Sequence, residues 1–536
     1  MTGSSRGEGG RLLTRGLPGG VAAGAITIGV AELLAGLMQR AGWSSGTPSP
    51  VLAVGGAFID RTPPWLKNFA VNNFGTHDKQ ILLAGIAVVL LVLSMLIGVL
   101  LVRRVMAALV LFVVLVAVAG AAVISRPHAS GVDLVPLLLG ALVGLWTLSI
   151  WRRRLLTEPA GQSRHTDEPG NTEPVARAMV DRRRVLGAAL GAVVVGALMT
   201  TAGRAISGSA RAVQQARAAF VVPKVPRPVT VPAGASVGVP GVTPFIVPSD
   251  EFYRIDTALV VPQVNPDTWR LRVTGMVEHE VEVDWPTLQT KPMQDAMITL
   301  MCVSNEVGGS LNGNTIWTGW PVRELLAEAG VKPGADMVLS TSADGWTAGT
   351  PLSALTDNRN ALVAVAMDGQ ALPPEHGFPA RIVVPGLYGY VSATKWVTEL
   401  KVTTYAKDQG YWTPRGWSQM GPVKTSSRID VPQNGTQVKP GANGKVAVAG
   451  VAWAQHRGVK AVQVRIDNGP WQTARLGTDA SIDAWRQWVY EWPATKGQHT
   501  IAVRATDDTG AVQTSVQAAP APNGSSGYDT ITVTVG

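Results

Sequence analysis

The sequence predicts a multi-domain protein: an N-terminal all-α membrane bundle, an α+β domain and a C-terminal all-β sandwich. Three observations support this. The 536-residue chain has only 15% charged residues and a mean hydropathy of +0.18, whereas soluble chains average about 25% charged residues. Long uncharged stretches are confined to its first part, and short β-rich runs follow residue 252. We place the membrane domain at 1–211, a Pro-rich linker at 212–250, the α+β domain at 251–432 and the sandwich at 433–536.

The first domain is predicted to contain about five transmembrane helices. Stretches without any charged residue, each close to the ~20 residues that cross a ~30 Å hydrocarbon core, are 81–102, 105–125 and 134–151. Residues 17–39 form another predicted span. It contains Glu32, which near a span end is expected to reach the lipid headgroups. A fifth span is predicted at Val185–Gly203, whereas 43–71 is expected to be an external loop with interfacial or re-entrant pieces.

Basic residues predict the orientation of these spans. With a cytoplasmic N-terminus, 13 basic residues lie in the inner segments and five in the outer ones, as the positive-inside rule requires. We therefore expect a multi-pass protein of the plasma membrane, with everything after Gly203 outside the cytoplasm. The pair Arg182-Arg183 before the fifth span resembles a twin-arginine export signal. A stop-transfer cluster is the alternative.

The distribution of the net charge of +9 along the chain excludes nucleic acid as a partner. Residues 1–211 hold 20 Lys and Arg against 10 Asp and Glu, whereas residues 212–536 hold 26 against 27. A nucleic-acid-binding enzyme is expected to place its basic excess on the folded module that touches phosphate. We therefore expect the lipid bilayer as a partner, and no nucleic acid.

The second half predicts a linker and two folded domains. Seven prolines between 223 and 248 favour an extended, semi-rigid spacer that holds the next domain off the membrane. The strands predicted for the α+β domain are 270–277, 297–303, 381–384 and 397–403, with a helix at 321–329 that ends at Gly330. Those predicted for the sandwich are 446–453, 461–467, 485–492, 499–505 and 528–535. An Asp467-Asn468-Gly469 hairpin turn and about 100 residues of such strands are typical of an immunoglobulin-like fold.

Cys302 is the single cysteine, which excludes an intramolecular disulfide and any multi-cysteine zinc or iron–sulfur site. It ends an apolar run that leads directly into a polar, Gly-rich turn. A thiolate suits a soft metal ligand or a nucleophile. A nucleophile needs an activating His, and His279, the nearest in sequence, has no supporting motif. A buried structural thiol is the third alternative.

A series of motifs around Cys302 carries a family resemblance. In order, they are Thr299-Leu300-x-Cys302-x-x-Asn305, Trp317-x-Gly319, Val322-x-x-Leu325-Leu326, Leu372-Pro373-x-x-His376-Gly377-Phe378-Pro379-x-Arg381, Val384-Pro385-Gly386, Gly389 and Lys395-Trp396. The region 252–432 thus resembles the molybdopterin-binding domain of the sulfite oxidase superfamily. Residues 433–536 are similar to the immunoglobulin-like dimerisation domain that follows it there, so a homodimer is one expected assembly.

This resemblance implies molybdenum held by the Cys302 thiolate and by one molybdopterin. The cofactor-binding residues that it implies are Phe252, Tyr253, Arg254, Cys302, His376, Arg381, Tyr388, Ser392 and Lys395. The expected catalytic residues are Cys302, Asn305, Glu306 and Trp317, and Cys302 is the expected metal ligand. The planar fork of Arg381 suits a phosphate. Each assignment has an alternative. Arg381 would then be a surface residue and His376 a loop residue, while Trp317 would belong to the core and Asn305 would be structural.

The sequence departs from the family where sulfite would bind. Sulfite oxidases follow the Cys-x-x-Asn unit with arginines, but here Glu306 and Val307 follow it. A carboxylate there would repel a doubly charged anion. We therefore disfavour sulfite and expect two-electron oxygen-atom transfer on a small or protein-bound S- or N-oxide type substrate. A cofactor-free exported binding or assembly module on the same fold is the alternative.

The membrane half is not expected to hold haem. The histidines before the linker are His77, His128 and His165, all in predicted loops, so the spans offer no facing pair of axial ligands. We expect this half to be an anchor, and the electron partner to be a quinone or a separate redox protein.

Overall fold

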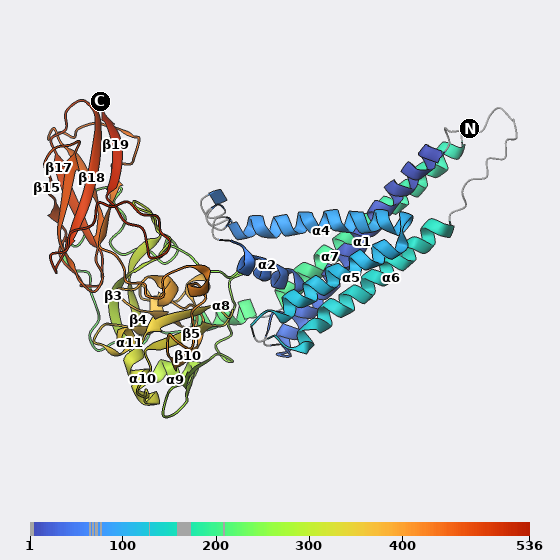
Figure 1. Ribbon diagram of the computed structural model, residues 1–536, viewed down its shortest axis with the longest axis horizontal. Helices are drawn as coiled ribbons and strands as arrows, with labels where there is room; N and C mark the ends of the chain where they lie inside the picture. The colour runs from blue at the N-terminus through green and yellow to red at the C-terminus, as the bar shows by residue number, and fades with distance from the viewer. Residues whose placement is uncertain are drawn as a thin grey trace. The chain divides into compact units, whose positions relative to one another are not determined.

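A computed structural model describes residues 5–44, 46–63, 66, 69, 73–74, 78–127, 129–157, 173–206 and 209–536 (Figure 1). The three histidines His77, His128 and His165 lie outside the described residues. The chain divides into two compact units. One comprises residues 1–210 with 258–260, and the other residues 211–257 and 261–536. The predicted linker, the sandwich and all of the α+β domain except residues 258–260 therefore form one unit.

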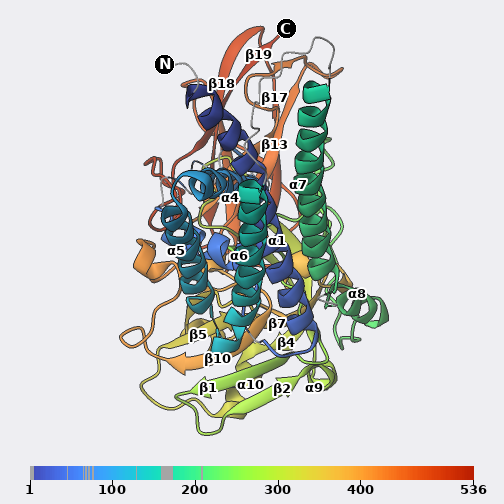
Figure 2. The ribbon, with the colours of Figure 1, turned by 90° about the vertical axis from the view of Figure 1, so that its right-hand side faces the viewer.

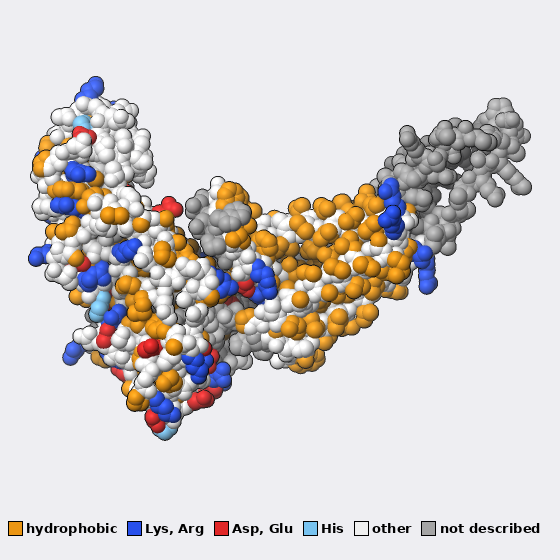
Figure 3. Space-filling view, viewed as in Figure 1, with side chains coloured by type: hydrophobic (Ala, Val, Ile, Leu, Met, Phe, Trp, Pro, Cys, Tyr) orange, Lys and Arg blue, Asp and Glu red, His pale blue; other side chains and the backbone are white. Residues whose placement is uncertain are grey.

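The first unit is helical. Its elements are α1 (Ser5–Arg40), α2 (Pro50–Arg61), α4 (Asp78–Arg103), α5 (Val105–Ile124), η2 (Gly131–Leu134), α6 (Val135–Thr157) and α7 (Glu173–Ile206). Four segments are long and apolar enough to cross a membrane: Gly16–Arg40, Lys79–Arg103, Val105–Ile124 and Gly131–Arg153. They correspond to four of the predicted spans, and apolar side chains cover much of this unit's visible surface (Figure 3). The fifth prediction corresponds to a shorter apolar stretch of α7, Gly187–Gly203.

Helix α1 is the centre of the helical unit, because its largest contacts are with α7, α6 and α4 (Figure 2). Gly29 packs against Gly196 of α7, and Gly36 packs against Gly203 one heptad later. A Cβ added at Gly203 would collide with the carbonyl of Glu32. Small residues allow this close approach of helix backbones, which is a common device in membrane bundles.

Glu32 does not reach toward the headgroups, so that expectation was wrong. Its side chain is buried, with 3% of the residue exposed. The Ser49 hydroxyl lies 2.7 and 2.9 Å from its two carboxylate oxygens, and the Val51 N–H donates to one of them at 3.3 Å. Ser49 is the N-cap of α2, so the carboxylate lies at the positive end of a helix dipole. Hydrogen bonds from Ser49 and Val51 thus satisfy the Glu32 carboxylate inside the unit.

Two sheets form the α+β part of the second unit. The first has the strand order β2 (Val281–Asp284), β1 (Arg270–Gly275), β10 (Val397–Thr403), β5 (Met337–Ser342) and β6 (Thr347–Pro351). The second has the order β3 (Gln294–Met301), β4 (Asn312–Pro321), β7 (Leu362–Met367) and β8 (Gln370–Ala371), with β9 (Arg381–Val383) paired to β7. The helices and 3-10 turns are α9 (Trp285–Thr290), α10 (Val322–Ala329), α11 (Ser353–Thr356), η3 (Pro374–His376), η4 (Gly389–Val391) and η5 (Thr413–Arg415). Helix α10 ends as predicted at Gly330, whose φ of 68° favours glycine.

The C-terminal part consists of two further sheets around a shared apolar core. One has the order β11 (Ser426–Val431), β13 (Val446–Trp453), β17 (Arg486–Trp492) and β16 (Arg475–Leu476). The other has the order β12 (Gln437–Val438), β19 (Asp529–Val535), β18 (Gly497–Asp507), β14 (Val459–Ile466) and β15 (Gln472–Thr473). The five predicted strands are present here, and β14 pairs with β15 across the predicted turn. The immunoglobulin-like assignment stays a prediction.

The predicted spacer packs onto the second unit. Residues 220–250 contain no helix or strand, as expected. However, Val237 N–H donates to Gln487 at 2.9 Å, and the Trp485 indole donates to Phe245 O at 3.0 Å. Before this segment, α8 (Ser209–Ala219) docks through Arg217, whose Nε donates to Leu372 O at 2.8 Å. The extended conformation was expected, whereas these contacts were not: the extended backbone finds hydrogen-bond partners on the folded part. Its role as a spacer from the membrane stays a prediction.

Candidate active site at Cys302

Cys302 lies directly after β3, where the sequence predicted a strand to enter a polar turn. Its N–H donates to Leu311 O at 2.9 Å and closes the loop that leads to β4. Its Sγ accepts a hydrogen bond from Ser304 N–H at 3.4 Å. Burial raises the pKa of the thiol above its ordinary value, although the nearby Lys395 charge opposes this. Coordination to a metal would remove this proton.

Two buried cations belong to this site: the charge of Lys395 acts on the Cys302 thiol, and Arg381 and Cys302 both act on Tyr253. The Arg381 guanidinium donates to His376 O at 3.2 Å and to Ala393 O at 3.4 Å. Lys395 donates to Asp256 at 3.0 Å and to Glu375 O at 2.9 Å. Burial lowers the pKa of Arg381 to about 10 and that of Lys395 to about 8. Both groups are thus charged at neutral pH in surroundings that disfavour charge.

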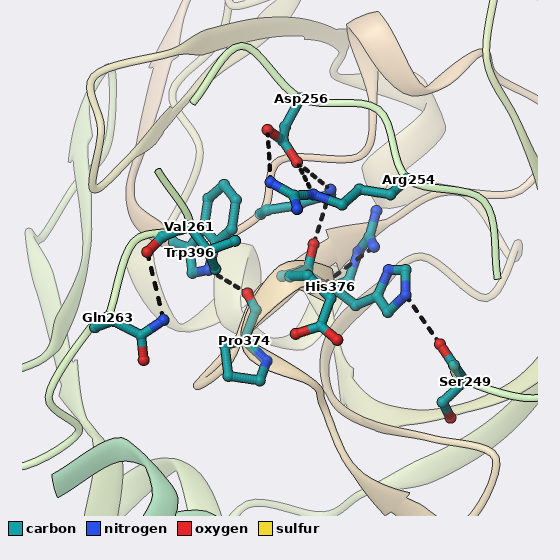
Figure 4. Close-up of polar contacts among 11 residues, drawn as sticks. Ser249, Arg254, Asp256, Val261, Gln263, Pro374, His376 and Trp396 are labelled. Atoms are coloured by element: carbon teal, nitrogen blue, oxygen red, sulfur yellow. Dashed lines mark hydrogen bonds and ion pairs between the residues drawn. The ribbon is translucent and has the colours of Figure 1, made fainter. Parts of the chain in front are cut away.

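His376 is the third member of this group and is held by a segment distant in sequence. Its Nε2 lies 3.0 Å from Ser249 O (Figure 4). Burial, with Lys395 and Arg381 adding to it, lowers the pKa of His376 to about 3. The imidazole is therefore neutral at pH 7. Nε2–H donates to the carbonyl of Ser249, so Nδ1 is left as an acceptor.

Several polar atoms at this site are buried with no hydrogen-bond partner among the described residues. They are His376 Nδ1, Arg381 Nε and Ser249 Oγ. Buried polar groups in folded proteins are nearly always paired, so an unpaired cluster indicates a ligand. Arg381 forms no ion pair with a carboxylate of the described residues, so this buried cation favours an anionic group such as a phosphate. With a thiolate beside them that suits a soft metal, these residues fit a molybdenum–pterin cofactor.

Aromatic rings connect the parts of the site. The ring of Phe252 stacks on Tyr253 with 5.2 Å between centroids. It also meets Trp317 and His376 edge-on at 5.7 and 5.6 Å. The guanidinium of Arg381 lies 5.1 Å from the Trp317 ring. Burial first, and the Cys302 charge second, raise the pKa of Tyr253 well above its ordinary value. Phe252 and Tyr253 therefore bring the 252–254 segment to the buried cations.

Trp317 forms a wall behind Arg381. It is fully buried in β4, and its indole N–H donates to Ile298 O at 3.2 Å. Because its only polar group is used within the sheet, the side chain supports the site through packing and through its contact with Arg381.

Asp256 and Ser249 are functional residues that the sequence reasoning missed. The carboxylate of Asp256 accepts from Arg254 at 2.9 Å and from Lys395 at 3.0 Å, so it connects two implied cofactor contacts (Figure 4). Its position two residues after Arg254 was the available signal. Ser249 offers none, because its carbonyl meets His376 only through the tertiary fold.

Three implied residues use their polar atoms to shape loops. The Asn305 side-chain oxygen accepts from Leu311 N–H at 2.8 Å. The Ser392 hydroxyl donates to Tyr388 O at 2.9 Å. Burial raises the pKa of Tyr388 to about 12, with the Cys302 charge contributing, so this phenol keeps its proton at neutral pH and lies within electrostatic reach of the thiol.

Glu306 differs from the other implied residues because it is exposed. Among the described residues, no hydrogen bond or ion pair involves its carboxylate. The structure therefore places it on the outer side of the Cys302 turn, where its charge remains in contact with solvent.

Several known proteins are similar to this part of the chain. Residues 258–412 match the family described as "Oxidoreductase molybdopterin binding domain". The mitochondrial sulfite oxidase of Rattus norvegicus is 29% identical over 320 residues, which cover 50% of this chain and 57% of that protein. An uncharacterized oxidoreductase, YuiH of Bacillus subtilis (strain 168), is 31% identical over 153 residues, or 28% of this chain and 74% of that protein. Among solved structures, the sulfane dehydrogenase SoxCD of Paracoccus pantotrophus is 24% identical, with a TM-score of 0.45 over 55% of this chain and 81% of that chain.

The fold and the site therefore define a molybdopterin oxidoreductase. The chain belongs to the sulfite oxidase superfamily. It spans somewhat more than half the length of the mammalian sulfite oxidase that it matches.

Proposed function

We propose that this protein is a membrane-anchored molybdenum oxidoreductase that transfers an oxygen atom to or from a neutral sulfur or nitrogen centre. The observation that carries the proposal is the buried Cys302 thiol at a site where Arg381, His376 and Ser249 keep buried hydrogen-bonding atoms without partners among the described residues. A structural thiol in an apolar core would not need such neighbours. They cost folding free energy unless a ligand satisfies them.

The residues of the site have separable roles in this proposal. When bound, a molybdenum–pterin group supplies two-electron oxygen-atom transfer. Cys302 would hold the metal, while Arg381, Lys395 and Arg254 would bind the anionic end of the pterin. His376 Nδ1 would accept a hydrogen bond from it. Tyr253 and Tyr388 keep their phenolic protons at neutral pH, so each can donate one hydrogen bond near the thiolate.

The charges around the Cys302 loop favour a neutral substrate. Three arginines of the second unit outside the implied pterin contacts are paired with carboxylates: Arg428 with Asp430 at 2.6 Å, Arg457 with Asp507 at 3.1 Å and Arg359 with Asp357 at 2.8 Å. Cations already neutralised by partners contribute little to binding a doubly charged anion. Glu306 adds a negative charge on the same turn. An S- or N-oxide type substrate, small or protein-bound, fits this balance better than sulfite.

The helical unit supports the proposed anchoring and orientation. Its four apolar helices support anchoring in a bilayer. An extracytoplasmic oxidoreductase requires a fifth crossing by α7, whose 34 residues extend about 50 Å at ~1.5 Å per residue. We further propose that electrons are exchanged with a quinone or a separate redox protein.

Metal analysis and a substrate screen test the proposal. The full chain, purified from a host that makes the cofactor, should contain about one molybdenum per chain. In a redox-dye assay it should turn over methionine sulfoxide or another S- or N-oxide faster than sulfite. Absence of molybdenum would favour the cofactor-free binding module instead. Faster turnover of sulfite would refute the neutral-substrate proposal.

A reporter fused after Gly536 tests the orientation. A reporter that works only outside the cytoplasm should be active at this position, and a reporter that works only in the cytoplasm should be inactive. Activity of a cytoplasmic reporter at the same position would show that α7 does not cross the membrane.

A further inference from the structure

The loop that carries Cys302 is not rigid by its own sequence. It runs from Cys302 to Leu311 and contains Gly308 and Gly309 in succession. Gly308 has a φ of +76°, and glycines leave the backbone more conformational freedom than other residues. Side chains from elsewhere must therefore contribute to fixing the direction of the thiol.

Arg428, from strand β11 of the C-terminal part, contacts this loop on both sides of Leu311. Its Nη1 donates to Gly309 O at 2.8 Å and to the side-chain oxygen of Asn312 at 2.9 Å. Leu311 lies between these two contacts and accepts the Cys302 N–H. Asn312 is the β4 residue paired with Met301, the residue before the cysteine. Arg428 thus fixes the segment against which the Cys302 backbone is bound.

Arg428 is itself held in place. Its Nε donates to Asp430 at 2.6 Å, and its Nη2 donates to Thr243 Oγ1 at 2.9 Å. Arg428 and Asp430 are each 7% exposed at the side chain. A charged pair this buried is costly unless its hydrogen bonds are completed, and here the loop and the Pro-rich segment complete them.

Other C-terminal residues contact the same loop. The Ser525 hydroxyl donates to Asn305 O at 2.6 Å. The carboxylate of Asp529 packs against Gly308, where a Cβ would lie only 2.8 Å from its Oδ1. The C-terminal part therefore contacts the loop at its start, its middle and its end.

We propose that Arg428 is a positioning residue that aims the Cys302 thiol. The C-terminal part thereby contributes to the metal site, beyond any role in dimer formation. The consequence for metal ligation rests on the proposed function. The consequence for the thiol itself does not, because it holds in the cofactor-free protein as well.

Cys302 is the only cysteine of the chain, so any thiol reagent reports on this loop alone. In full-length, cofactor-free protein, Arg428→Gln should increase the rate of iodoacetamide alkylation about tenfold, because charge-assisted hydrogen bonds to the loop are lost. Arg428→Lys should give an intermediate rate, since it retains the charge without the fork. The matched control is Arg475→Gln, which removes an exposed arginine of the same part of the chain and should leave the rate unchanged.

The loaded enzyme provides two further measurements. The Mo(V) electron paramagnetic resonance spectrum of Arg428→Gln should differ from the wild-type spectrum, and kcat should fall while KM is retained. If Arg428→Gln does not fold, Ser525→Ala removes one hydroxyl contact to Asn305 and should show the same changes at smaller size.

An alkylation rate within twofold of wild type, or equal to that of Arg475→Gln, would overturn the proposal. An acceleration explained by a parallel loss of global stability, with the spectrum unchanged, would also overturn it. If the wild-type protein contains no molybdenum, the proposed function fails, whereas the alkylation experiment still decides the role of Arg428.

Discussion

Buried polar side chains of the two units differ in how completely they are hydrogen-bonded. In the helical unit, Ser49 and Val51 satisfy the carboxylate of Glu32 at the N-terminus of a helix. In the oxidoreductase unit, Arg381 and His376 are equally buried but retain unpaired polar atoms. A satisfied buried charge stabilises the fold, whereas an unsatisfied group is retained at a cost that a ligand can offset. Several unpaired atoms gathered at one place, next to Cys302, thus distinguish the cofactor site from Glu32.

Arg428 extends this comparison, because it is a buried charge near Cys302 with a nearly complete set of partners. By the same criterion it belongs with the structural charges, although it acts on the metal-ligand loop. This is why we assign it a positioning role and do not place it among the cofactor contacts.

The largest expected effect comes from Cys302→Ser. A serine oxygen is a poor replacement for a soft thiolate ligand, so we expect oxygen-atom transfer to fall at least ~1,000-fold, in line with the loss of an essential active-site group. The free energy of unfolding of the cofactor-free protein should change by less than ~1 kcal/mol. Dye-linked activity and denaturant unfolding measure the two. Ser310→Ala, at an exposed serine of the same loop, is the control, and an active Cys302→Ser variant would contradict the assignment of Cys302 as a metal ligand.

Arg381→Met tests whether the buried charge with an unpaired atom binds the cofactor. Loss of a buried phosphate-binding fork should weaken cofactor retention by ~3 kcal/mol, or about 100-fold. The cofactor-free protein should remain as stable as wild type, since replacing a desolvated charge by an apolar chain is often neutral or stabilising. Molybdenum content after dialysis and thermal unfolding measure these effects. Exposed Arg272 supplies the control, Arg272→Met. A destabilised variant that retains its cofactor would reverse our interpretation of the site.

The pKa of His376 predicts a pH dependence of stability. Because the pKa is about 3 in the folded protein and about 6.5 when unfolded, the unfolded chain binds the proton first as pH falls. Stability should therefore decrease from pH 6.5 toward pH 3. His376→Gln should remove roughly 2–3 kcal/mol of the decrease between pH 7 and pH 4. Denaturant unfolding of the cofactor-free protein at both pH values measures this, with His279→Gln as the exposed control. Equal slopes for the wild type and His376→Gln would show that His376 is not held neutral.

The smallest expected effect is that of Glu32→Gln in the helical unit. The amide retains one acceptor for Ser49 but loses the charge at the α2 N-terminus, so we expect a loss of ~1 kcal/mol in stability. Thermal unfolding in detergent measures it, and Ser49→Ala should give a loss of similar size. Dye-linked activity should stay at the wild-type level. An unchanged midpoint in both variants would remove Glu32 from the class of stabilising charges.

Local patterns predicted much of this structure. Three uncharged stretches and the apolar stretch around Glu32 located four of the apolar helices, and strand periodicity located β10 and β13 residue for residue. The position of Cys302 at a strand end was also correct, because an apolar run entering a Gly-rich turn is a local signal. Proline content predicted the extended conformation of residues 220–250 but not their packing, since it reports on backbone conformation and says nothing about the surface on which an extended chain packs.

The sequence by itself determined the class of enzyme and the set of candidate residues. A single cysteine and an ordered series of motifs can be read without knowledge of contacts. Only the tertiary structure decided which of those residues line the candidate cofactor site and which shape its loops. It placed Arg381, Lys395 and His376 together, with Asp256 and Ser249 as partners, and gave Asn305 and Ser392 to the loops. It also brought Arg428 to the Cys302 loop from more than a hundred residues away. The physical reason is that burial and hydrogen-bond pairing depend on segments distant in sequence, and these decide whether a charge stabilises the fold or awaits a ligand.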